Sequence, residues 1–477
     1  MSKDRINNKI AKNFLWSFAE KFGAQFVSLI VSFVLAKVLG PKAFGTVALI
    51  MVFINILQVL VDAGFGTALI QKKETDETDF STVFFFNLIF CIIFYFLVYA
   101  FAPTIAYFFE DNTLIKYIRV LALSIIIYGF KNIQYSYVSK HLMFRKFFFS
   151  TIGGTIFSAI VGIYMAYHGF GIWSIIAQYL TNACIDTIVL WITVGWYPSF
   201  KFSYKRLKTL FSYGGKILSA NILDVFYNEF KNLMIGKMFS TTNLGYFNRG
   251  EIIPRTIVVN TDKSIDSVLF PVLSNYQNDE DGIRQFVRNA ITTSVFFLAP
   301  MMIGLFAIAP NAVRIILSEE WLPCVPYLRV YCVTFMFYPI HTANLNSIKA
   351  LGRSDLFFKL EVYKVSVCLA LLLFSIRYGL MMIAYSLIIS SFLCQAINAW
   401  PNRKLIGYGY IQQFRDISPY LLASMIMGLG VYFLSYIDLD YRIIMIIQLF
   451  TGVFLYTIIM YLMKSEVFLN LVKFLKR

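Results

Sequence analysis

Seven charged residues inside otherwise apolar stretches are the side chains of this sequence best suited to binding a charged ligand. If those stretches cross a membrane, each charge at a helix centre costs roughly 2.5 to 3.5 kcal/mol. Lysine and arginine attract anions, and the planar arginine fork donates paired hydrogen bonds to phosphate. We therefore expect substrate-binding cations at Lys21, Lys231, Arg249 and Arg255, and gating or ion-coupling carboxylates at Asp62, Asp224 and Glu229.

Helical spacing groups some of these residues. Asp224, Asn228 and Lys231 are separated by four and then three positions, which places them on one helix face. Glu229 lies beside that face. The alternative for each single charge is an internal ion pair, or an aliphatic stem that carries the charge to the membrane surface.

Signatures of catalysis and of cofactor binding are absent from the sequence. It contains no G-x-x-x-x-G-K-[ST] phosphate-binding loop and no G-x-G-x-x-G motif after a strand. The six cysteines form no C-x-x-C pair, and the three histidines are scattered. We therefore expect no enzyme activity, no cofactor and no metal site.

The elements that must position these charges follow from composition. Hydrophobic residues make up 58% of the 477 residues and charged residues 14%, against roughly 45 to 50% and about 25% in soluble domains. A helix needs roughly 20 apolar residues to cross a hydrocarbon core. We predict an all-α, polytopic membrane protein with about 14 transmembrane helices. The predicted spans are 13–38, 43–66, 81–108, 113–138, 147–168, 171–195, 210–238, 243–271, 287–309, 323–348, 356–376, 379–400, 416–436 and 441–463.

The net charge of +16 is distributed unevenly among the connections between these spans. Most lysines and arginines outside the spans lie at the two termini and in alternate connections, which is the positive-inside pattern. This predicts a protein of the cytoplasmic membrane with both termini in the cytoplasm. It also explains the charge without nucleic-acid binding and predicts contact with membrane lipids. The opposite side carries only Lys37, Lys42, Lys116, Arg314, Arg377 and Arg442.

The two halves of the chain resemble each other at an offset of 200 residues. Lys37 aligns with Lys237 and Gly45 with Gly245, each between an odd-numbered span and the next. Weak internal symmetry of this kind is typical of transporters, and an even number of helices per repeat makes the halves parallel. We predict two six-helix lobes with a cleft between them. The predicted parts are an N-terminal lobe at 1–196, a cytoplasmic linker at 197–209, a C-terminal lobe at 210–412, and two helices with a basic tail at 413–477.

A series of short motifs resembles the Wzx-type polysaccharide-repeat flippases of the multidrug/oligosaccharidyl-lipid/polysaccharide exporter superfamily. Singly each motif is weak, but their order along fourteen predicted spans is fairly specific. They are LGP at 39–41, DAGFG at 62–66, FR at 144–145, GFGIW at 169–173, LGYFNR at 244–249, LFPVLS at 269–274 and ALGRSD at 350–355.

The resemblance implies alternating-access transport of a polyprenyl-pyrophosphate-linked oligosaccharide to the outer leaflet, for surface polysaccharide such as capsule or lipopolysaccharide. It also implies polysaccharide polymerase and assembly proteins as candidate partners. Lys231 stands where relatives are expected to have an acidic residue, which puts ion coupling at that position in doubt.

Two other functions remain open on the sequence. A cation-coupled multidrug antiporter of the same fold would need uncompensated carboxylates in its cavity, which Asp62 or Asp224 could supply. A membrane glycosyltransferase or polymerase usually needs a sizeable loop for sugar chemistry, and the sequence predicts none.

Overall fold

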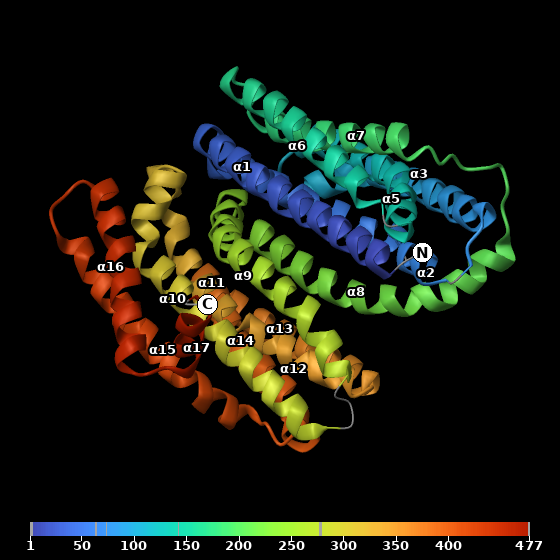
Figure 1. Cartoon of the computed structure of the whole chain (residues 1–477). Helices are drawn as coiled ribbons and strands as arrows, with labels where there is room; N and C mark the ends of the chain where they lie inside the picture. The colour runs from blue at the N-terminus through green and yellow to red at the C-terminus, as the bar shows by residue number, and fades with distance from the viewer. Residues whose placement is uncertain (1–2, 63, 73, 142, 276–278, 476–477) are drawn as a thin grey trace. The chain divides into compact units, whose positions relative to one another are not determined.

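The computed structural model describes residues 3–62, 64–72, 74–141, 143–275 and 279–475, and all regular structure in these ranges is helical (Figure 1). The chain divides into two units, Met1–Gly245 and Tyr246–Arg477, and each is described by itself. Because all regular structure in the described residues is helical, the all-α prediction is confirmed. The structure describes the helical backbone, but not the side chains, of residues 3–22, of several positions in 212–275, and of 354, 358, 474 and 475.

Helices of the first unit pack mainly around the long helix α1. Helix α6 lies against both α1 and α7, and α8 packs along α1 and α2. The unit consequently includes α8, which begins at Tyr204, inside the predicted linker at 197–209. The predicted domain boundaries stay a prediction. The helices are α1 (Lys3–Asp62), α2 (Phe65–Gln71), α3 (Glu77–Phe108), α4 (Leu114–Leu121), α5 (Leu123–Lys140), α6 (Phe144–Tyr167), α7 (Ile172–Val194) and α8 (Tyr204–Met238).

The second unit is built around α10, which packs against α11, α15 and α16. Helix α9 (Thr241–Asn275) begins in the first unit and continues into the second. The other helices are α10 (Glu280–Ile316), η1 (Glu319–Cys324), α11 (Val325–Met336), α12 (Tyr338–Ala350), α13 (Ser354–Ser375), η2 (Ile376–Tyr378), α14 (Leu380–Leu405), α15 (Tyr410–Phe433), η3 (Leu434–Tyr436), α16 (Tyr441–Leu462) and α17 (Glu466–Leu475).

Apolar, membrane-length helices recur in both units. Among the described residues, eight helical segments are long and apolar enough to cross a membrane. This supports a multi-pass membrane protein, whereas the number of 14 crossings stays a prediction. Two predicted spans are each divided into shorter helices: 113–138 becomes α4 and α5, and 323–348 becomes α11 and α12.

Helix α1 joins two predicted spans, 13–38 and 43–66, across a kink. Gly40 has φ 68° and ψ 175°, outside the helical region, and Pro41 follows it. Proline lacks the N–H that would continue the helical hydrogen bonds, and glycine tolerates a positive φ. These two residues therefore account for the break between the two spans.

The backbones of α1 and α9 cross at unusually close range beside this kink. A Cβ added to Gly45 would lie 1.6 Å from the Thr241 carbonyl oxygen, and one added to Gly245 would lie 2.2 Å from the Pro41 carbonyl oxygen. The two contacts are reciprocal, because residues 41 and 45 correspond to 241 and 245 at the offset of 200.

An aromatic core fills the end of the first unit where α2, α3 and α5 meet. It contains Phe65, Phe80 and Trp196, all almost fully buried, and the rings of Phe80 and Trp196 lie 5.8 Å apart. The core holds α2 and the start of α3 in fixed positions. The residues that line the cavity described next depend on that placement.

Candidate functional site

A polar cavity of about 320 Å³ lies in the first unit, where α1 ends and α2 packs against α5. One carboxylate, one ammonium group, one amide and several hydroxyls face it. Such a lining can hydrogen-bond a polar ligand within an apolar bundle. The lining residues are Asp62, Gly66, Thr67, Ile70, Tyr128, Lys131, Asn132, Tyr135 and Ser136.

Three polar groups of this cavity converge beside Gly66. The Asn132 amide donates a hydrogen bond to Asp62 Oδ1 at 3.2 Å. Ser136 Oγ and Asp62 Oδ1 lie 2.8 Å and 3.5 Å from the point that a Cβ on Gly66 would occupy. The predicted site residue Asp62 thus lies in a group of hydrogen-bonding side chains from two helices.

The cation of the cavity, Lys131, is held by a carboxylate from α7. Lys131 forms an ion pair with Asp186, whose side chain is 4% exposed. Ser150 of α6 donates a second hydrogen bond to Asp186. Neither Lys131 nor Asp186 is among the seven site residues predicted from the sequence. Both are charged residues inside predicted spans, so the criterion that selected the other seven would have found them.

Two predicted residues of α8 are buried in the first unit. The Asn55 amide of α1 donates to Glu229 Oε1 at 2.8 Å, which links α8 to α1. Lys231 follows two positions later, and its residue surface is 5% exposed. Glu229 and Lys231 therefore lie in the interior of the helix bundle, as charged residues with a specific role would.

The two predicted arginines of α9 differ in environment. Arg249 is 2% exposed, and its guanidinium lies 5.2 Å from the ring centroid of Trp321, a cation–π contact. Arg255 has a side chain 64% exposed and pairs with Glu251 at 3.1 Å, one helical turn earlier. Both belong to the second unit, whereas Lys231 belongs to the first, and neither lines the cavity at Asp62. The side chains of Lys21 and Asp224 lie outside the described residues.

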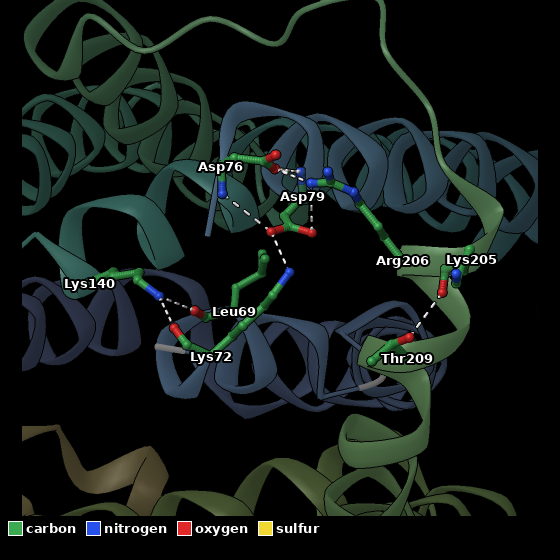
Figure 2. A network of polar contacts seen from close by, with 8 residues as sticks. All are labelled: Leu69, Lys72, Asp76, Asp79, Lys140, Lys205, Arg206 and Thr209. Carbon is green, nitrogen blue, oxygen red and sulfur yellow. Dashed lines mark hydrogen bonds and ion pairs between the residues drawn. The ribbon is translucent and has the colours of Figure 1, made fainter. Parts of the chain in front are cut away.

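A network of charged residues lies at the start of α3 (Figure 2). Asp79, 1% exposed, pairs with Lys72 at 2.6 Å and with Arg206 of α8 at 3.4 Å. Arg206 also pairs with Asp76, which caps the first turn of α3. The Arg206 guanidinium holds the pKa of the Asp76 carboxyl below its usual range. This network ties α8 to α2 and α3.

Lys140 at the end of α5 caps the neighbouring helix α2. Its ammonium group donates to the carbonyl oxygen of Leu69 at 2.9 Å and to that of Lys72 (Figure 2). Burial, and then the charge of Lys72, lower the pKa of Lys140. A cation at the carboxyl end of a helix satisfies carbonyls that have no partner within the helix.

Comparison with known proteins identifies the family. The sequence model of a family described as polysaccharide biosynthesis protein matches residues 34–326. This chain belongs to the polysaccharide biosynthesis protein family. The resemblance to polysaccharide flippases seen in the sequence is thereby confirmed.

Proteins from several bacteria are similar to this chain over most of its length. The teichuronic acid biosynthesis protein TuaB of Bacillus subtilis (strain 168) is 25% identical, with 78% of each chain covered. The succinoglycan biosynthesis transport protein ExoT of Rhizobium meliloti (strain 1021) is 23% identical, covering 90% of this chain and 87% of its own. The lipopolysaccharide biosynthesis protein WzxC of Escherichia coli (strain K12) is 21% identical, covering 71% and 69%. These relatives support the prediction of a transporter rather than an enzyme.

Solved structures with the same fold are transporters as well. The lipid II flippase MurJ, in an inward closed conformation, has a TM-score of 0.77 at 18% identity, covering 95% of this chain and 99% of its own. An inward-facing multidrug resistance MATE family transporter of the MOP superfamily has a TM-score of 0.65 at 13% identity, covering 80% and 94%. At these identities the likeness shows the fold of this family member.

Proposed function

We propose that this chain carries a polyprenyl-pyrophosphate-linked oligosaccharide repeat from the inner to the outer leaflet of the cytoplasmic membrane, for surface polysaccharide synthesis. The observation that carries the proposal is the cavity of the first unit, which is lined by several polar side chains and lies where α1, α2 and α5 meet. Its carboxylate, amide and hydroxyl groups match the hydrogen-bonding needs of sugar hydroxyls. The relatives' names, which refer to teichuronic acid, succinoglycan and lipopolysaccharide, support a sugar cargo.

Four cations are proposed to neutralise the pyrophosphate: Lys21, Lys231, Arg249 and Arg255. The burial of Lys231 and Arg249 supports this role, since charged groups inside membrane proteins are costly and usually functional. Arg255 is exposed and can reach a ligand beside its ion pair with Glu251. Differential contacts in the inward and outward states then drive the transport cycle.

Asp62, Asp224 and Glu229 are proposed to couple transport to an ion or to gate the pathway. Asp62 faces the cavity and accepts a hydrogen bond from Asn132. Glu229 accepts one from Asn55 on α1, so a change in its charge would alter the contact between α1 and α8. Polysaccharide polymerase and assembly proteins are proposed as partners that receive the translocated repeat.

Charge-neutral substitution tests the cation roles. We expect Lys231→Gln and Arg249→Gln each to lower surface polysaccharide at least tenfold and to accumulate the lipid-linked repeat in the inner leaflet. The measurement is polysaccharide and lipid-linked intermediate in cells whose membranes contain normal amounts of the variant protein. Arg377→Gln, which removes an exposed arginine of the predicted opposite side, is the matched control and leaves both unchanged.

Normal surface polysaccharide in Lys231→Gln and Arg249→Gln, at normal protein abundance, contradicts the proposed cation roles. Resistance to cationic drugs on overexpression, without any effect of gene deletion on polysaccharide, would favour the multidrug antiporter instead. Sugar incorporation by the purified protein would favour a glycosyltransferase.

A further inference from the structure

The connector between α7 and α8, residues 195–203, and the first turn of α8 expose an unusual number of aromatic rings. Phe200 is 98% exposed, Tyr204 72%, Tyr197 64% and Phe202 55%. Rings exposed to this extent are costly in water and are typical of membrane interfaces, where an apolar ring can lie below a polar headgroup. The exposure of these rings therefore indicates a surface that contacts an apolar environment rather than water alone.

The backbone of the connector is held firmly in place, so the exposure belongs to a defined structure. The amide N–H of Ser199 donates to Ser81 Oγ at 2.9 Å, and that of Ser203 donates to Thr82 Oγ1 at 3.1 Å. Trp196 is buried in the aromatic core. The connector is thus anchored to α3. Its other rings stay largely exposed, with Phe200 stacked on Phe85 of α3 and Tyr197 beside Trp191 of α7.

Basic residues of this segment divide into one that points inward and three that point outward. Figure 2 shows Arg206 extending to Asp76 and Asp79, which also binds Lys72. These acids are thereby already engaged by cations. The exposed lysines of the segment are Lys201, Lys205 and Lys208.

Both neighbouring elements place the connector at a membrane boundary. Helix α7 ends at Val194 and α3 begins at Glu77, and both helices are long and apolar enough to span a membrane. The connector, pinned beside the start of α3, continues directly from the end of α7. Its rings and lysines are therefore at the depth where lipid headgroups begin.

We propose that this surface, Tyr197 to Lys208, is a binding site for anionic phospholipid headgroups of the leaflet at which α7 ends. The rings enter the boundary between headgroups and acyl chains, and the three lysines attract the lipid phosphates and their negative charge. Charge complementarity selects anionic over zwitterionic lipid. This site is separate from the proposed sugar cavity, and its function is to anchor the start of α8 to the membrane.

Tryptophan quenching by brominated lipids tests the site in the full-length protein. The Phe200→Trp protein is reconstituted in vesicles that contain phosphatidylglycerol and phosphatidylcholine at one fixed ratio. In one set of vesicles the phosphatidylglycerol is brominated, and in the other set the phosphatidylcholine is brominated. The parent protein, which contains six tryptophans, supplies the background to subtract. We expect quenching of the added indole to be stronger with brominated phosphatidylglycerol, because each nearby lysine enriches anionic lipid up to about fivefold.

A control position lies in the turn between α15 and α16. Leu439 is 48% exposed and is flanked by two acidic residues, Asp438 and Asp440. Leu439→Trp should show no preference for phosphatidylglycerol, or a preference against it. Substituting Lys201, Lys205 and Lys208 by Gln in Phe200→Trp should remove the preference, whereas Gln at the exposed lysines Lys359, Lys404 and Lys473 should leave it unchanged.

Equal quenching by the two brominated lipids at position 200 overturns the preference for anionic lipid. Absence of quenching by either lipid overturns the membrane contact altogether and leaves water or an acidic protein as the neighbour of this surface. Neither result bears on oligosaccharide transport, which the polysaccharide measurements test separately.

Discussion

At the scale of single residues, the ion pair between half-buried Lys131 and the buried carboxylate of Asp186 is the clearest determinant of the cavity. Asp186 is 4% exposed and receives both the Lys131 ammonium group and the Ser150 hydroxyl. Removing Lys131 alone leaves the buried Asp186 carboxylate without its cation, which destabilises the folded protein. The pair also sets the direction of Lys131, which lines the cavity with Asp62.

We therefore predict that Lys131→Met destabilises the protein more than the double variant Lys131→Met with Asp186→Leu. The single variant strands a charge, whereas the double variant removes both charges together. Thermal unfolding in detergent, with all four members of the double-mutant cycle, measures the difference. If the effects of Lys131→Met and Asp186→Leu simply add in the double variant, the two residues are not energetically coupled and the prediction is wrong.

At the scale of elements, the crossing of α1 and α9 depends on two glycines that occupy equivalent places in the two halves of the sequence. Any side chain at Gly45 or Gly245 would overlap a backbone carbonyl of the other helix, as the distances of 1.6 Å and 2.2 Å show. Backbone atoms cannot rotate away as the end of a flexible side chain can. The helices would have to separate for either position to carry a Cβ.

Gly245→Ala and Gly45→Ala are accordingly predicted to lower the amount of folded protein in the membrane and the level of surface polysaccharide. Gly153→Ala in α6 is the control, since no atom lies within 4 Å of its added Cβ. Alanine there should be neutral or stabilising by up to about 1 kcal/mol, because alanine favours helices over glycine. The measurements are the abundance of the protein in the membrane, its thermal stability and the level of surface polysaccharide. Wild-type values of all three for Gly245→Ala would contradict the close crossing.

At the scale of the whole molecule, the distribution of basic residues predicts an even number of crossings. Both termini then lie in the cytoplasm, and the turn at Leu439 lies outside. Alkaline phosphatase fused after Leu439 should be active, and the same enzyme fused after Arg477 should be inactive, whereas a fluorescent protein after Arg477 should be bright. An active phosphatase after Arg477 would contradict the predicted topology.

The sequence by itself determined the class of this protein and the approximate positions of most of its helices. Hydropathy is a property of consecutive residues, so apolar stretches such as 81–108 and 441–463 predicted α3 and α16 closely. Family membership was also accessible, because short motifs keep their order along the chain. The same local information predicted Asp62 as a site residue, since its charge interrupts an apolar span.

Only the tertiary structure decided which of the charged residues meet. Lys131 and Asp186 are 55 positions apart, and Asp76 and Arg206 are 130 apart, so their pairing depends on how α3, α5, α7 and α8 pack. The structure also distinguished buried Arg249 from exposed Arg255, which lie on the same helix and looked equivalent as residue types. The local sequence pattern indicates that a charged residue lies within a helix. The partner of that residue and its burial depend on contacts between helices that are distant in the sequence.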